Sequence, residues 1–306
     1  MRVHLDTDFA GDTDDACALG LLLGWPDVEI TGITTVADPD GRRAAYVERF
    51  LAIAECDGIP VAAGAGASLA GKEMGVLPNH DTFWGGDPVV PAAVSADAAA
   101  SLLAASVDVG ATVIGIGPYT NLALLLEREP AVFQGVPVVL MGGHVDPPRD
   151  GLPQWGPDMD WNVQCDTTAA RAVFDHADDL TLVTLPATLD AHLRAAHLAP
   201  LEASGPLGSL LARQARAYGA RNGFADLGKA HAMLPDDLLN FQYDPVACAT
   251  AVGWRGVTTD KPHLRAVLDG GVLRFERDAG GKRVTIVTHV DGDAFATCWL
   301  EAIAAA

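Results

Sequence analysis

Five aspartates are concentrated near the start of the chain, in the segment LDTDFAGDTDDACALGLLLG. They lie within ten positions, immediately before an apolar run: Asp6, Asp8, Asp12, Asp14 and Asp15. Two carboxylates about 4 Å apart repel each other by roughly 4 kcal/mol at the effective dielectric of a protein surface. Some other interaction must therefore offset the repulsion within this segment.

Helix capping explains only part of this acidic cluster. Asp is favoured at the start of a helix, where it accepts hydrogen bonds from free backbone N–H groups and meets the positive end of the helix dipole. Asp6 and Asp8 have a different setting, because they leave an apolar strand two residues apart and so point to the same side. A bound Ca²⁺ or Mg²⁺ ion, which takes carboxylate oxygens as ligands, would offset the repulsion.

Short runs rich in Val and Ile alternate with longer segments rich in Ala and Leu. The strand candidates are RVHLD, VEITGITTVA, IPVAAG, ATVIGIG, VPVVLMGG and DLTLVTL. This alternation predicts an α/β fold with an open, mostly parallel, Rossmann-like sheet and helices on both faces. In such sheets ligands bind outside the carboxyl ends of the strands, so the site is expected there.

The longer segments predict where the helices lie. Residues 15–25 are expected to form a buried helix that ends at Pro26, and TNLALLLEREP a second helix that begins at Thr120 or Asn121. The segment 200–232 is helical in its first part and looser in its second, which indicates an excursion over the strand ends that can act as a lid. We find no linker or internal repeat and expect one domain, residues 1–306.

Composition and charge exclude several classes of function. The chain has 20 Lys and Arg against 40 Asp and Glu, a formal net charge of −20, which opposes binding to a nucleic acid polymer. The five cysteines are scattered without a CxxC pair, as expected for reduced thiols in the cytoplasm. The amino-terminal segment is acidic where a signal peptide is apolar, and no run of about 18 apolar residues is present. We expect a cytoplasmic protein without membrane contact.

Two enzyme families carry paired carboxylates at a strand end. Haloacid-dehalogenase-type phosphatases use DxD, usually followed by Thr or Val, whereas Phe9 follows Asp8 here. The chain more closely resembles the nucleoside hydrolases, because LDTDFAGDTDDACAL matches the longer variant of their signature DxDPGxDDxxA. Six further segments follow in the order of that family: ITTVA, GPYTNLALLL, VVLMGG, DMDWNVQCD, YDPVACA and VDGDAF.

This resemblance implies hydrolysis of the N-glycosidic bond of a ribonucleoside to ribose and free base, in purine or pyrimidine salvage. It implies Ca²⁺ at the strand ends, and a homodimer or homotetramer. The implied ligands of the ion are Asp8, Asp15, the backbone carbonyl of Thr120, and Asp244. Asp8 is also the implied base that activates the attacking water, and Asp244 belongs to the catalytic group. The implied contacts to the sugar come from Asp14, Asp160, Asn162 and Met141, with Asp6 supporting the loop.

The sequence departs from the family pattern at the sugar. Members often have TTVxGN after the second strand, with the Asn on ribose, whereas this chain has TTVADPDG, so Asp38 or Asp40 takes that place. Asp160 replaces a Glu and is shorter by one methylene. Asp12 is additional to the short signature and is open to three interpretations: a metal ligand, a helix cap or a brace of the loop.

Tyr243 stands where members with HDP have a His near the departing base. Tyrosine is a poorer acid near neutral pH, with a reference pKa of about 10. His80, in NHDTFWGG, is the first candidate for the proton donor, and His231 on the expected lid is the second. The candidates for contacts with the base are Trp84, Trp155, Trp161, Arg216, Tyr218 and Arg221. These departures also keep open a rival function, a homologue that binds a metal and a ribosyl ligand without turnover.

Overall fold

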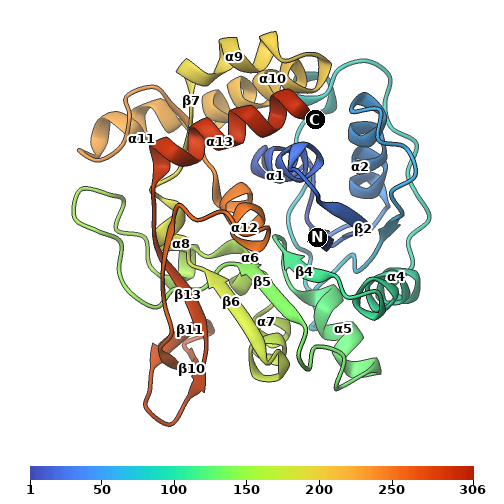
Figure 1. Ribbon diagram of the computed structural model, residues 1–306, viewed down its shortest axis with the longest axis vertical. Helices are drawn as coiled ribbons and strands as arrows, with labels where there is room; N and C mark the ends of the chain where they lie inside the picture. Colours follow the sequence, from blue (N-terminus) through green and yellow to red (C-terminus); the bar gives the residue numbers. More distant parts are fainter.

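The computed structural model describes residues 1–306 and has one large sheet at its centre (Figure 1). The strands lie in the order β3-β2-β1-β4-β5-β6-β13-β9. Their bounds are β1 Arg2–Thr7, β2 Glu29–Thr35, β3 Val61–Ala63, β4 Thr112–Gly115, β5 Pro137–Met141, β6 Asp179–Val183, β9 Val257–Asp260 and β13 Thr285–Val290. All neighbours are parallel except β13 and β9. The expected open, mostly parallel α/β sheet is confirmed; the sequence does not predict the antiparallel edge strand β9.

Helices cover both faces of the sheet (Figure 1). One layer contains α1 (Asp14–Gly24), α2 (Arg42–Ile53), α10 (Pro206–Asn222), α12 (Tyr243–Ala251) and α13 (Gly292–Ala305). The other contains α4 (Ala96–Asp108), α5 (Thr120–Arg128) and α7 (Thr167–His176). The short helices are α3 His80–Phe83, η1 Pro157–Met159, α6 Trp161–Cys165, α8 Leu185–Thr188, η2 Ala195–His197, α9 Leu198–Ala203 and α11 Phe224–Ala230. None of the helices has both the length and the apolar character needed to span a bilayer.

Successive strand residues supply the two apolar layers in turn. On β4, Ile114 packs in the layer of α1 and α12, and Val113 packs in the layer of α4 and α5. On β5, Val139 likewise packs in the layer of α1 and α12, and Leu140 packs in the layer of α4 and α5. This period of two is the property of a strand buried on both faces, and it explains why the Val- and Ile-rich runs are almost continuously apolar.

The strand register brings the functional segments to one edge. Asp6 on β1 pairs with Thr34 on β2 and with Gly115 on β4, so the carboxyl ends of these central strands lie level. Gly115 pairs in turn with Leu140 near the end of β5. The segments that follow these strands therefore meet at the same side of the sheet, although they are far apart in the sequence.

Two small antiparallel sheets complete the fold. One pairs β7 (His192–Arg194) with β8 (Leu238–Phe241), and the other contains β10 (His263–Asp269), β11 (Val272–Arg277) and β12 (Lys282–Arg283). The side chain of Gln164 on α6 bonds to β11 as a strand would, donating to the carbonyl of Leu273 at 2.7 Å and accepting from its N–H at 3.0 Å. This pair of bonds anchors α6 beside the carboxyl edge.

A buried histidine on β1 predicts a pH dependence of stability. His4 is fully buried between the hydroxyls of Ser106 and Thr34, at 2.9 and 3.0 Å, and burial lowers its pKa from 6.5 to about 3. The unfolded chain takes up this proton near pH 6.5 while the folded chain does not. His4 therefore lowers the stability as the pH falls from 6.5 toward 3, by about 3 kcal/mol at roughly pH 4.5.

The variant His4→Gln tests this dependence, because glutamine hydrogen-bonds but does not titrate. Urea unfolding of both proteins at neutral pH and at about pH 4.5 should show a smaller acid-induced loss in the variant. Equal losses in the two proteins would contradict the assignment.

Candidate active site

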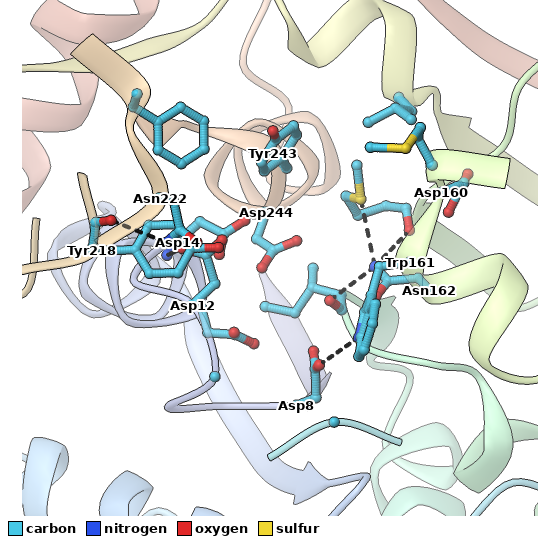
Figure 2. Close-up of a pocket in the computed structure, with 18 of the residues that line it drawn as sticks. Asp8, Asp12, Asp14, Asp160, Trp161, Asn162, Tyr218, Asn222, Tyr243 and Asp244 are labelled. Carbon is cyan, nitrogen blue, oxygen red and sulfur yellow. Dashed lines mark hydrogen bonds between the residues drawn. The ribbon is translucent and has the colours of Figure 1, made fainter. Parts of the chain in front are cut away.

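A cavity of about 530 Å³ opens at the carboxyl edge of the sheet (Figure 2). Its walls come from the segment between β1 and α1, the ends of β4 and β5, residues 155–162, the end of α10 with the start of α11, and the start of α12. The end of α10 and the start of α11, within the 200–232 segment, thus lie at the strand ends, whereas the second part of this segment, expected to be looser, forms the helix α11. The cavity is lined by six carboxylates: Asp8, Asp12, Asp14, Asp15, Asp160 and Asp244.

Three of these carboxylates form a compact, buried group. Asp14 and Asp15 begin α1, Asp244 is the second residue of α12, and oxygens from all three lie within 4.8 Å of one another. The two helices pack against each other, which brings together residues about 230 positions apart. Burial is the main cause that raises all three pKa values well above the usual range, and repulsion from neighbouring carboxylates adds to it. An all-oxygen donor set of this charge fits a hard divalent cation.

Asp8 lies on the loop after β1, beside the group. Its carboxylate accepts a hydrogen bond from the indole N–H of Trp161 at 3.2 Å (Figure 2). Burial raises the pKa of Asp8, whereas the charge of Arg43 lowers it. Repulsion from Asp8 in turn raises the pKa of Asp15 and of Asp244, which shows that these carboxylates interact.

Arg43 is a lining residue that the sequence analysis missed. It is buried on α2, and its guanidinium donates to the backbone carbonyls of Asp8, of Phe9 at 2.8 Å and of Ala37 at 2.8 Å. It thereby holds the turn that carries Asp8. An arginine within a helix usually indicates an exposed face, so the sequence alone gives no signal for this role.

Two polar residues at the start of α6, Asp160 and Asn162, are fixed by hydrogen bonds to the backbone. The amide of Asn162 donates to the carbonyls of Ile116 and Met141, both at 3.0 Å. Asp160 caps α6 by accepting from the N–H of Val163 at 3.1 Å, and it also accepts from Gly143 at 2.5 Å. Burial raises the pKa of Asp160 to about 6. Met141, Asp160 and Asn162, the residues expected to contact the sugar, all line the cavity.

Thr120 and Asp38 lie outside the cavity, which differs from the expectation for both. Thr120 begins α5, where its hydroxyl donates to Asp166 at 2.8 Å; the residue that lines the cavity at the end of β4 is Ile116. Asp38 accepts from the N–H groups of Arg43 and Ala44 at 2.9 and 3.0 Å, so its carboxylate is used at the start of α2. A helix start thus accounts for Asp38, whereas the hydroxyl of Thr120 is bound to Asp166, the residue that caps α7.

The alternative to Asp38 is also outside the cavity. Asp40 is exposed and pairs with Arg42 at 2.7 Å. Asp12, by contrast, lines the cavity, and it accepts from the amide of Asn240 at 2.7 Å and from the N–H of Asp14 at 3.4 Å. Burial raises the pKa of Asp12 to about 6. Among its three interpretations, these bonds favour the brace of the loop.

No histidine lines the cavity. His80 begins α3, where its Nδ1 lies 2.8 Å from the hydroxyl of Tyr46 and its ring stacks on that tyrosine. His231 follows α11 and its Nδ1 lies 3.0 Å from the carbonyl of Leu227. Both candidates for the proton donor therefore lie outside the cavity: the ring of His80 is engaged by Tyr46 on α2, and the ring of His231 by a carbonyl of α11.

An aromatic wall faces the carboxylates, formed by Trp155, Tyr218, Phe224 and Tyr243. The buried ring of Phe241 on β8 supports three of them, with centroids 5.6 Å from Trp155, 5.9 Å from Phe224 and 5.4 Å from Tyr243. Tyr218 stacks on Phe224 at 5.9 Å. Flat rings of this kind suit a planar ligand group.

The other candidates for contacts with a base are divided by the structure. Trp161 and Arg221 line the cavity. Trp84 does not; it is buried against Tyr46, with centroids 4.5 Å apart. Arg216 lies outside and pairs with Glu202 at 2.6 Å.

The fold and the site define a class of enzyme: an α/β protein that presents buried carboxylates and an aromatic wall to a small polar ligand at the carboxyl edge of a parallel sheet. The family model of the inosine-uridine preferring nucleoside hydrolases matches residues 3–297. The chain therefore belongs to this family, and it is an N-ribosyl hydrolase of ribonucleosides.

Individual relatives agree with this assignment along the whole chain. The pyrimidine-specific ribonucleoside hydrolase RihA of Salmonella schwarzengrund (strain CVM19633) is 28% identical over an alignment of 309 positions, and the alignment covers 96% of each protein. A plant nucleoside hydrolase, the PpNRh1 enzyme, has a similar structure, with a TM-score of 0.81, 21% identity and coverage of 100% and 99%. The purine-preferring ribonucleoside hydrolase from Gardnerella vaginalis has a TM-score of 0.80, 21% identity and coverage of 99% and 98%. The names of these relatives cover both pyrimidine and purine substrates.

Proposed function

We propose that the protein hydrolyses the N-glycosidic bond of a ribonucleoside in a calcium-dependent reaction, with Asp8 as the base that activates water. The observation that carries this proposal is the buried group of Asp14, Asp15 and Asp244, with Asp8 beside it. Such a group is costly without a cation, and the aromatic wall opposite suits a planar base.

The residues present fit a bound Ca²⁺. Asp15 and Asp244 would hold the ion together with Asp8, and Asp14 would bind the 3′-hydroxyl of the sugar. Calcium takes carboxylate and carbonyl oxygens in flexible geometry, which this donor set provides. A bound divalent ion supplies positive charge that lowers the pKa of water and attracts the hydroxyls of the sugar.

The surroundings of Asp8 support its proposed role in proton transfer. Its carboxylate lines the cavity and is oriented by the N–H of Trp161, while Arg43 holds the carbonyl of the same residue. Asp8 takes a proton from water, the water oxygen bonds to C1′, and the electron pair of the C1′–N bond leaves with the base. The positive charge that develops on the ribose ring is stabilised by the surrounding carboxylates.

The sugar contacts are proposed from the same geometry. Asn162 is fixed by two carbonyls, and Met141 packs at the end of β5, so both present a rigid surface to the ribose. Asp160 already accepts two backbone N–H groups, so it can add only its remaining acceptor capacity to a sugar hydroxyl. Tyr243 lies at the base side, next to Asp244.

Release of both products from ribonucleosides tests the proposed function. Purified protein with Ca²⁺ is incubated with uridine, cytidine, inosine and adenosine, and ribose is measured by a reducing-sugar assay and free base by chromatography. We expect equimolar ribose and base from at least one substrate. Binding of these nucleosides without release of base would instead support the rival function of a non-catalytic homologue.

A further inference from the structure

Two arginines line the cavity, and their environments differ. Arg43 is buried and its guanidinium is engaged by backbone carbonyls. Arg221 is exposed, lies at the end of α10, and has neither an ion-pair nor a hydrogen-bond partner in the structure. Most other arginines of the chain, such as Arg216 on the same helix, pair with a carboxylate or a carbonyl. Arg221 is therefore the cation of the cavity that is free to bind a ligand.

The position of Arg221 places it at the aromatic wall. It follows Tyr218 by three residues on α10, so the two side chains share one face of the helix. Phe224, stacked on Tyr218, lies just beyond the end of the helix. Tyr218 and Phe224 are the rings that we expect to lie against a planar leaving group. Arg221 thus lies at the end of the cavity where the base, rather than the sugar, is expected.

A cation at this end has a defined chemical use. When the C1′–N bond breaks, its electron pair remains on the base, and in uracil the negative charge spreads to the carbonyl oxygens. No histidine lines the cavity to protonate the base as it leaves, and the phenols of the wall hold their protons near neutral pH. A guanidinium carries only donors, so it stabilises a carbonyl oxygen and repels an exocyclic amino group.

We propose that Arg221 binds the outer edge of the departing base and stabilises the negative charge on its carbonyl oxygen, so that the enzyme favours oxo-bases over amino-bases. This inference rests on the proposed function. Uracil and hypoxanthine carry an oxygen at the outer edge where cytosine and adenine carry an amino group. The departed base then takes a proton from solvent water, and Asp8 returns the proton that it took to the solvent, so the products are ribose and neutral base.

The variant Arg221→Met tests the inference, because methionine keeps much of the length of the side chain but removes its charge and its donors. We expect kcat/KM for uridine to fall about tenfold to a hundredfold, the usual effect of losing a hydrogen bond to a charged group. Most of this loss should lie in kcat, because the charge on the base develops in the transition state. The value for cytidine should change little.

Arg216→Met is the matched control, because Arg216 is on the same helix but outside the cavity. It should keep the ratio of kcat/KM for uridine to that for cytidine, whereas Arg221→Met should lower the ratio. An equal loss for both substrates, or no loss for either, in an Arg221→Met protein with an unchanged Tm would overturn the inference and leave the proposed function standing. A wild-type protein that releases no base from any nucleoside would overturn both.

Discussion

Asp8→Asn is expected to lower kcat by at least about a thousandfold, the scale on which enzymes depend on a positioned base. Asparagine has the shape of aspartate and still accepts the hydrogen bond of Trp161, but it cannot take a proton from water. The loss of one ligand charge for the ion adds to the effect. The measurement is the rate of ribose release from the best substrate, at saturating Ca²⁺.

The fold should survive this change. Asp8 raises the pKa of Asp15 and Asp244 by electrostatic repulsion. A neutral residue in its place therefore reduces this repulsion in the protein from which the ion has been removed. We expect the Tm of Asp8→Asn to equal or exceed that of the wild type without ion. Asp40→Asn is the matched control, since Asp40 forms only an exposed ion pair with Arg42 and such pairs contribute little. Turnover by Asp8→Asn close to that of this control would refute the role of Asp8 as base.

The acidic centre could be predicted from the sequence because two simple patterns converge on it. Asp6 and Asp8 follow an apolar strand run, and Asp14 and Asp15 precede an apolar helical run, so their place at a strand end follows from periodicity alone. Asp244, by contrast, was placed by the family resemblance, because nothing local ties it to residues more than 200 positions away. The structure supplies the reason for its proximity, which is the packing of α12 on α1.

Other residues could not be placed because their side chains have two possible uses. A carboxylate such as Asp38 near a helix start can face a ligand or cap the helix, and only the path of the chain decides. His80 lies in a segment with little regular structure, so periodicity gives no direction for its ring. Arg43 bonds to carbonyls of two separate turns, and such bonds leave no pattern in the sequence.

Removal of divalent ions is expected to abolish turnover and to lower the stability, increasingly so as the pH rises. The pKa values of Asp14, Asp15 and Asp244 are raised in the folded protein without ion. At a pH above the usual pKa of a carboxyl group, the folded state therefore holds more protons than the unfolded state. The contribution of these three carboxylates to the stability of the ion-free protein is therefore highest at low pH and falls as the pH rises through their raised pKa values. A bound ion replaces the protons and removes this loss.

The measurement is the Tm across pH, with a chelator and with Ca²⁺. At an ion concentration of about 100 times the Kd, the stabilisation should be about 2.7 kcal/mol. Asp244→Asn supplies the matched variant: with a chelator at high pH it should be more stable than the wild type, because one of three mutually repelling charges is gone, and Ca²⁺ should stabilise it less. If the wild-type protein keeps both its turnover and its Tm in the presence of the chelator, the carboxylates share protons rather than an ion. That result would remove the basis of the metal-dependent mechanism.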